Sequence, residues 1–88
     1  MPSRELRVTN ELGIHARPAQ HIVKIAARFE ADLFLTKDRD RVNGKSIMGV
    51  LMLAAEPGSI VKLEAVGADA EDLLVALEEL FEAKFHED

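Results

Sequence analysis

The feature that most constrains the fold is the junction at residues 10–19, NELGIHARPA. A polar stretch containing a glycine leads into a proline and then into apolar residues that recur at helical spacing. These apolar residues are Ile22, Ile25, Ala26 and Phe29. Inside helices proline is tolerated in the first turn, where backbone N–H groups have no intrahelical partner. We therefore predict that Pro18 lies in the first turn of a helix that begins close to His15.

Three residues at this predicted helix start have chemistry of interest: His15, Ala16 and Arg17. The N–H groups of Ala16 and Arg17 are expected to point outward at the positive end of the helix dipole, where anions are stabilised. Imidazole, with an unperturbed pKa of about 6.5, is largely neutral at physiological pH and is then a nucleophile. Its attack on a phosphoryl donor would leave a dianion to which Arg17 can donate charge-assisted hydrogen bonds. The alternative is that His15 only caps the helix and Arg17 is a solvated charge.

A second motif, VNGKSIMGVLM at residues 42–52, follows the first along the chain. Together the two motifs resemble those of HPr, the histidine-containing phosphocarrier family of the bacterial phosphotransferase system. The resemblance covers nearly the whole chain, with matching order and spacing. It implies that His15 is phosphorylated on its pros nitrogen, Nδ1, and that Arg17 supports the phosphate. It also implies that Ser46 is the serine that a dedicated kinase phosphorylates in some members.

The same resemblance implies the partners. Members accept a phosphoryl group from enzyme I, pass it to EIIA-type acceptors, and in some cases are modified by an HPr kinase/phosphorylase. Such a chain is a phosphorylated substrate of enzymes and not a catalyst, and no cofactor is implied because the reactive group is a side chain. The backbone of Ala16 and Arg17 is expected to bind the phosphate. The residues expected to dock partners are Lys24, Lys45, Ile47, Met48, Leu51 and Met52.

Length and composition limit the other possibilities. A chain of 88 residues, 48% hydrophobic and 31% charged, favours a single globular domain over residues 1–88. It contains no cysteine, which excludes disulfides and cysteine-ligated metals. Residues 1–5 show no signal peptide, and the longest apolar run, 47–55, is too short to insert into a membrane. We expect a cytoplasmic monomer.

Charge bears on the partners. The net charge of −5 argues against nucleic acid, because phosphate backbones favour basic proteins. Residues 17–28 nevertheless carry Arg17, Lys24 and Arg28 without an acidic residue. This segment would attract acidic partners, although it would look the same if it were simply a solvated helix face. His21 and His86 lack paired ligands, and we expect no metal site.

Hydrophobic periodicity predicts four strands and three helices in the order βαββαβα. The expected strands are 6–9, 33–36, 41–42 and 60–66. The expected helices are 16 to 28–30, 47–55 with Ser46 as N-cap, and one that starts at the N-cap Asp69 and turns Leu73, Leu77 and Leu80 inward. The pattern predicts an α+β fold, a two-layer open-faced sandwich in which three helices cover one face of a four-stranded antiparallel sheet. A ferredoxin-like domain with an extra helix also fits the pattern.

Three functional alternatives accompany the phosphocarrier hypothesis. Leu12 and the tail at 85–88 look more like the nitrogen-related branch of the family, often called NPr, whereas residues 43–48 look more like the sugar branch. A mainly regulatory binding protein, whose working form is phosphorylated at Ser46, is a second alternative. The third is an unrelated α+β binding domain in which the His-Ala-Arg-Pro match is accidental.

Overall fold

In the computed structural model the chain forms the predicted βαββαβα order, and the structure describes residues 2–86. Residues 87 and 88 of the tail motif lie outside this range. The elements are β1 (Ser3–Arg7), α1 (Ala16–Ala26), β2 (Asp32–Lys37), β3 (Asp40–Asn43), α2 (Ile47–Leu53), β4 (Ile60–Val66) and α3 (Ala70–Glu82), followed by a short 3₁₀ segment, η1 (Lys84–His86).

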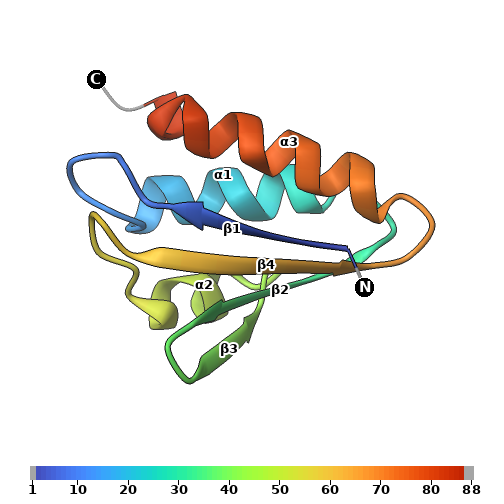
Figure 1. Cartoon of the computed structure of the whole chain (residues 1–88), viewed down its shortest axis with the longest axis horizontal. Helices are drawn as coiled ribbons and strands as arrows, with labels where there is room; N and C mark the ends of the chain where they lie inside the picture. Colours follow the sequence, from blue (N-terminus) through green and yellow to red (C-terminus); the bar gives the residue numbers. More distant parts are fainter. Residues whose placement is uncertain (1, 87–88) are drawn as a thin grey trace.

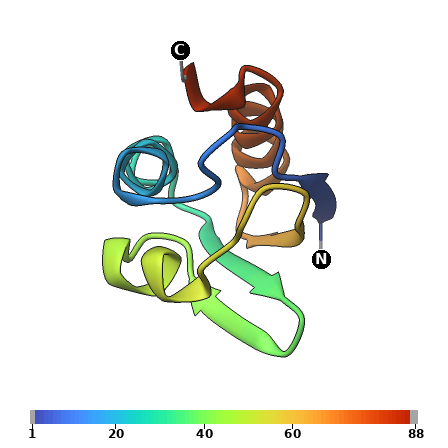
Figure 2. The same cartoon turned by 90° about the vertical axis from the view of Figure 1, so that its left-hand side faces the viewer.

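The sheet has the strand order β1-β4-β2-β3, and every neighbouring pair is antiparallel. Figures 1 and 2 show all three helices on one face of this sheet, which confirms the open-faced sandwich. β1 lies earlier than the predicted 6–9. Val8 has left the strand: its N–H donates to the Ser59 carbonyl at 2.9 Å, and its carbonyl accepts from the Gly58 N–H at 2.7 Å.

The core lies between the sheet and the helices. Strand residues reach it at every second position, as the burial of Leu33 and Leu35 in β2 and of Val61 and Leu63 in β4 shows. The helices contribute their inward stripes, including the predicted Leu73, Leu77 and Leu80. The large core residues are Val8, Ile14, Ile22, Leu33, Leu35, Val50, Leu53, Val61, Leu63, Leu73, Leu74, Leu77, Leu80, Phe81 and Phe85.

The helix ends depend on contacts that sequence periodicity does not contain. α1 ends at Ala26, before the predicted 28–30. The Lys45 Nζ then donates a hydrogen bond to the Phe29 carbonyl at 2.8 Å, in the turn that follows. Ser46 is the N-cap of α2, as predicted, and its Oγ accepts from the Gly49 N–H at 3.1 Å. α2 stops at Leu53, short of the predicted 55, because Ala54 adopts a left-handed φ of 52°.

The C-terminal end forms a hook that sequence periodicity did not predict. Lys84, Phe85 and His86 have φ values of 53°, 57° and 57°, a region that residues other than glycine seldom adopt. The hook buries Phe85, whose ring centroid lies 4.7 Å from that of Phe81. This aromatic contact offsets the unfavourable backbone conformation.

Asp69 lies at the predicted N-cap position of α3, but its side chain does not cap that helix. The carboxylate instead accepts hydrogen bonds from the N–H groups of Glu30 at 2.9 Å and Ala31 at 2.8 Å. These bonds join the start of α3 to the turn between α1 and β2. The bond from Glu30 is the main reason that the pKa of Asp69 lies below its ordinary value of 3.8.

We predict that Asp69→Asn lowers the urea midpoint at pH 7, because the amide cannot accept both backbone bonds as well as the carboxylate does. With a lowered folded-state pKa, the carboxylate stabilises the fold above its unfolded-state pKa of about 3.9. That contribution is lost as the pH falls through the folded-state pKa. Urea titrations between pH 7 and pH 2 are expected to show the gap between the two proteins closing in acid. Asp72→Asn, in the first turn of α3, is the matched control, and an equal effect there would contradict this account.

Candidate functional site

The loop before α1 is held from both sides. Within it, the Asn10 side chain is buried, and its Nδ2 donates to the Gly13 carbonyl at 2.8 Å. Across the molecule, the Ile14 N–H donates to the Ala55 carbonyl at 2.8 Å, just after α2. Figures 1 and 2 show this loop, the start of α1 and the segment after α2 gathered at one end of the molecule. The fold therefore presents residues 10–19 as a fixed junction.

Gly13 makes the close approach to Ala55 possible. Its φ is +71°, and a Cβ at this position would lie 2.6 Å from the Ala55 carbonyl oxygen. Gly58 also has a positive φ, +89°, but a Cβ there would meet nothing within 4 Å. Alanine substitutions at these two positions therefore distinguish the effect of backbone strain from that of steric overlap.

We predict that Gly13→Ala destabilises the protein by about 2–4 kcal/mol, because strain of roughly 1–3 kcal/mol adds to the overlap. Gly58→Ala carries the strain alone and is expected to cost about 1 kcal/mol. Chemical denaturation of both variants measures the difference. Equal losses of unfolding free energy would show that the contact with Ala55 does not hold the loop.

His15 is the N-cap residue of α1, with an extended backbone (φ −109°, ψ −158°), and its carbonyl accepts the first helical bond from the Ala19 N–H at 2.9 Å. Its side chain forms no capping hydrogen bond to the helix, so the alternative of a purely capping histidine is not supported. The side chain is half-buried, and its Nε2 is shielded from solvent.

The first turn of α1 suits an anion. Pro18 lies in this turn, as predicted, and is buried. It has no N–H, while the N–H groups of Ala16 and Arg17 have no intrahelical acceptor. The first turn holds no acidic residue. These two donors and the helix dipole therefore favour a negative charge beside His15.

Arg17 is exposed and extends the positive character along α1. It lines a pocket of about 180 Å³ together with Gln20, His21 and Lys24. These residues follow at intervals of three and four and so share one helix face. The structure thus places two of the predicted site residues, Arg17 and Lys24, on one basic surface that begins at the His15 end of α1.

The predicted docking residues divide into three groups. Ile47, Met48 and Met52 are exposed by 41%, 67% and 75% and form what we call the α2 patch. Leu51 is half-buried and packs partly against the core. Lys45 is also half-buried, because its Nζ is bonded to the Phe29 carbonyl. Leu12, on the loop before His15, is a further strongly exposed apolar residue at 67%.

Of the two other histidines, His21 lines the basic pocket of α1 and His86 lies in η1. The ring centroids of His21 and His86 lie 6.0 Å apart. Within residues 2–86, no three His, Cys, Asp or Glu side chains are arranged to hold a metal ion. No helix in that part of the chain is long and apolar enough to cross a membrane.

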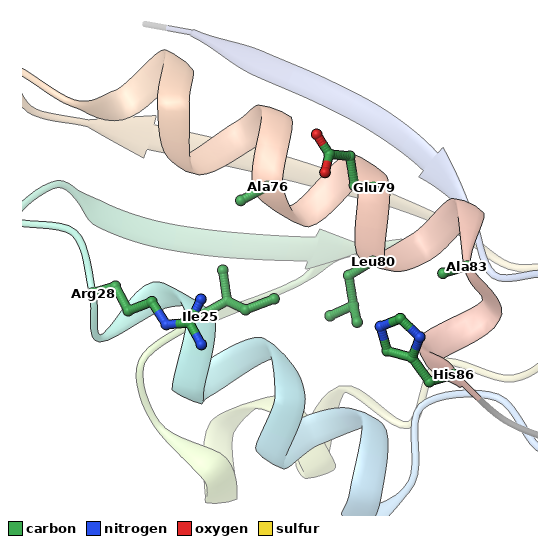
Figure 3. A pocket seen from close by; sticks show the side chains of 7 residues that line it. All are labelled: Ile25, Arg28, Ala76, Glu79, Leu80, Ala83 and His86. Atoms are coloured by element: carbon green, nitrogen blue, oxygen red, sulfur yellow. The ribbon is translucent and has the colours of Figure 1, made fainter.

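A second pocket, of about 380 Å³, lies between α1 and α3. In Figure 3, Arg28 and His86 stand at its two ends, with Ile25 and Leu80 between them. Its remaining lining residues are Ala76, Glu79 and Ala83. It shares no lining residue with the basic pocket of α1, and nothing in the sequence motifs pointed to it.

Comparisons with known proteins agree with the geometry. The family model described as the PTS HPr component phosphorylation site matches residues 2–83. The phosphocarrier protein HPr of Treponema pallidum (strain Nichols) is 47% identical over 88 residues, which is the whole of both chains. The crystal structure of HPr-C-His from Thermoanaerobacter tengcongensis has a TM-score of 0.95 and 41% identity, covering 100% of this chain and 99% of that one. A structure of an HPr dimer from the same organism has a TM-score of 0.79 and 41% identity, covering 99% and 100%.

The fold and these matches define a small phosphocarrier built as an open-faced α+β sandwich, with a histidine at the start of its first helix. The chain belongs to the HPr family of the phosphoenolpyruvate-dependent phosphotransferase system. The predicted family is confirmed, and the alternative of an unrelated domain with an accidental motif is wrong.

Proposed function

We propose that the chain accepts a phosphoryl group from enzyme I on Nδ1 of His15 and passes it to EIIA-type acceptors. The observation that carries this proposal is the place of His15 at the N-terminus of α1, half-buried with Nε2 shielded from solvent. The loop bonds through Asn10 and Ile14 fix the backbone on either side of the loop that leads to His15.

The transfer needs little beyond positioning and charge stabilisation. In-line attack by the Nδ1 lone pair forms an N–P bond as the donor's bond to phosphorus breaks. The new dianion lies at the positive end of the helix dipole, within the reach of the N–H groups of Ala16 and Arg17. The Arg17 guanidinium adds charge-assisted hydrogen bonds after its side chain turns from the basic pocket toward the phosphate.

Partner docking is assigned to the exposed surface beside this site. The α2 patch supplies apolar contact area, and Leu51 supplies its half-buried edge. Lys24 on α1 adds positive charge, as does Lys45 when its bond to the Phe29 carbonyl opens. A patch of this kind suits partners that bind briefly, because a small interface releases quickly.

The relay is tested by onward transfer. Purified protein is incubated with phosphoenolpyruvate and catalytic enzyme I, and an EIIA-type acceptor is then added. The expected result is an acid-labile phosphoryl group that appears on this chain and moves to the acceptor when enzyme I has been removed. Phosphorylation of this chain without onward transfer would limit the proposal to its first half. No uptake from an enzyme I that phosphorylates a known HPr would overturn it.

Ser46 is the proposed regulatory phosphosite, through a kinase of the HPr kinase/phosphorylase type. Its half-buried hydroxyl caps α2, directly before Ile47 of the α2 patch. A phosphate there would be tolerated by the helix N-terminus but would give the docking surface a negative charge. The fold would then persist while docking weakens.

We predict that Ser46→Asp slows phosphoryl uptake about tenfold, because the added charge repels an acidic partner face. Ser46→Asn is the matched control. Asparagine has nearly the same shape as aspartate and caps helices equally well, but it adds no charge. Initial rates with limiting enzyme I compare the two, and thermal unfolding checks the fold. Equal rates for both variants would exclude an electrostatic switch at Ser46.

A further inference from the structure

The two methionines of the α2 patch share one open helix face. Met48 and Met52 are 67% and 75% exposed, and their four-residue spacing places them next to each other on α2. Val50 and Leu53 hold the opposite side of the helix in the core. The thioethers are thus open to reagents in solution, and the helix does not depend on them for its packing.

Met48 and Met52 do not compete for an oxidant with a more reactive cysteine. The chain contains no cysteine, and its third methionine is Met1, so no thiolate competes with the thioethers. Met48 and Met52 lie on the same short helix as Ile47, the third member of the α2 patch. Any change in their polarity alters the patch itself.

We propose that Met48 and Met52 form a reversible oxidation site that controls docking on the α2 patch; this inference rests on the proposed function. The oxidant is hydrogen peroxide. It transfers one oxygen atom to the sulfur: an S–O bond forms, the O–O bond breaks, the sulfur loses two electrons and the remaining oxygen leaves as water. A thiol-dependent methionine sulfoxide reductase reverses the step, with two thiols becoming a disulfide and the oxygen leaving as water.

Oxidation acts on docking and leaves the chemistry of the site intact. A sulfoxide is polar and accepts hydrogen bonds, so burying it in an apolar interface without a donor is unfavourable. Neither His15 nor Arg17 is altered. We therefore expect affinity for enzyme I to fall about tenfold, which corresponds to about 1.4 kcal/mol, while the rate at saturating concentration of this chain is maintained.

The experiment compares phosphoryl uptake before and after peroxide. Peptide mass spectrometry locates the added oxygen atoms, and circular dichroism follows the fold. We expect Met48 and Met52 to oxidise within a few-fold of the rate of free N-acetylmethionine amide, KM to rise about tenfold with kcat unchanged, and the reductase to restore KM. Oxidised protein with the KM of the untreated protein would overturn the inference, as would methionines that resist peroxide.

A Met48→Leu, Met52→Leu double variant locates the effect. Leucine keeps the volume and the apolar character but cannot be oxidised. Whatever KM this variant has before peroxide, the same KM is expected afterwards. A rise as large as that of the parent chain would place the damage elsewhere and overturn the inference. Failure of the untreated parent chain to accept phosphate would instead overturn the proposed function, so the two failures are distinguishable.

Discussion

Replacing His15 with alanine is expected to abolish phosphoryl uptake from enzyme I and to leave the fold nearly unchanged. The side chain supplies the only nucleophile that the proposal uses. It forms no capping bond to α1, so the helix is expected to persist without it. Incorporation of labelled phosphate from phosphoenolpyruvate measures uptake, and urea denaturation measures stability.

His86→Ala is the matched control for this experiment. His86 lies in η1, lines the pocket between α1 and α3, and is absent from the basic pocket that contains Arg17. The control is expected to accept phosphate at the rate of the parent chain. Residual labelling of His15→Ala would show that another residue carries the phosphoryl group. Loss of labelling in both variants would show that the effect is not specific to His15.

The second large effect is expected at Arg17. Arg17→Ala removes the guanidinium but keeps the helix N–H groups, so uptake is expected to slow about 100-fold, as when one donor is removed from a charge-stabilising site. Arg17→Lys keeps the positive charge but loses the planar fork of donors. Its rate of uptake is expected to lie between those of the parent chain and Arg17→Ala. Single-turnover phosphorylation by enzyme I measures all three proteins.

Arg28→Ala controls for the change in net charge. Arg28 follows α1 in the chain, is exposed, and lines the pocket on the α3 side. Arg28→Ala changes the charge of the molecule by the same amount as Arg17→Ala. Its rate of uptake is expected to stay within about twofold of that of the parent chain, because exposed charges far from a site are screened by salt. Equal losses at both positions would mean that Arg17 acts only through overall attraction of the partner.

Much of the fold could be predicted from the sequence because local signals agreed with the tertiary structure. The alternation at 60–66, the N-cap at Ser46 and Pro18 in the first turn of α1 each mark a boundary within a few residues. The family itself was predicted from the two motifs, and the comparisons confirm it.

The predictions failed where distant contacts determine the backbone. The hook at η1 places three non-glycine residues at positive φ for the burial of Phe85, and no local preference predicts that. Asp69 carried the signal of a capping residue, but its carboxylate bonds to the turn after α1, thirty-eight residues away in sequence for Ala31. The bond from the Lys45 Nζ to the Phe29 carbonyl was also not predicted, while the docking role of Lys45 stays a prediction. Each contact joins segments that sequence periodicity treats separately.

The central claim is that one nitrogen of one histidine carries the phosphoryl group. Its most direct test is phosphorus and nitrogen NMR of the protein after incubation with phosphoenolpyruvate and enzyme I, with a known HPr as the positive control. The account predicts a single phosphohistidine at His15 in which phosphorus is coupled to Nδ1, because Nε2 is shielded from solvent. Phosphate on Nε2, phosphate on another residue, or no adduct while the control reacts would contradict it.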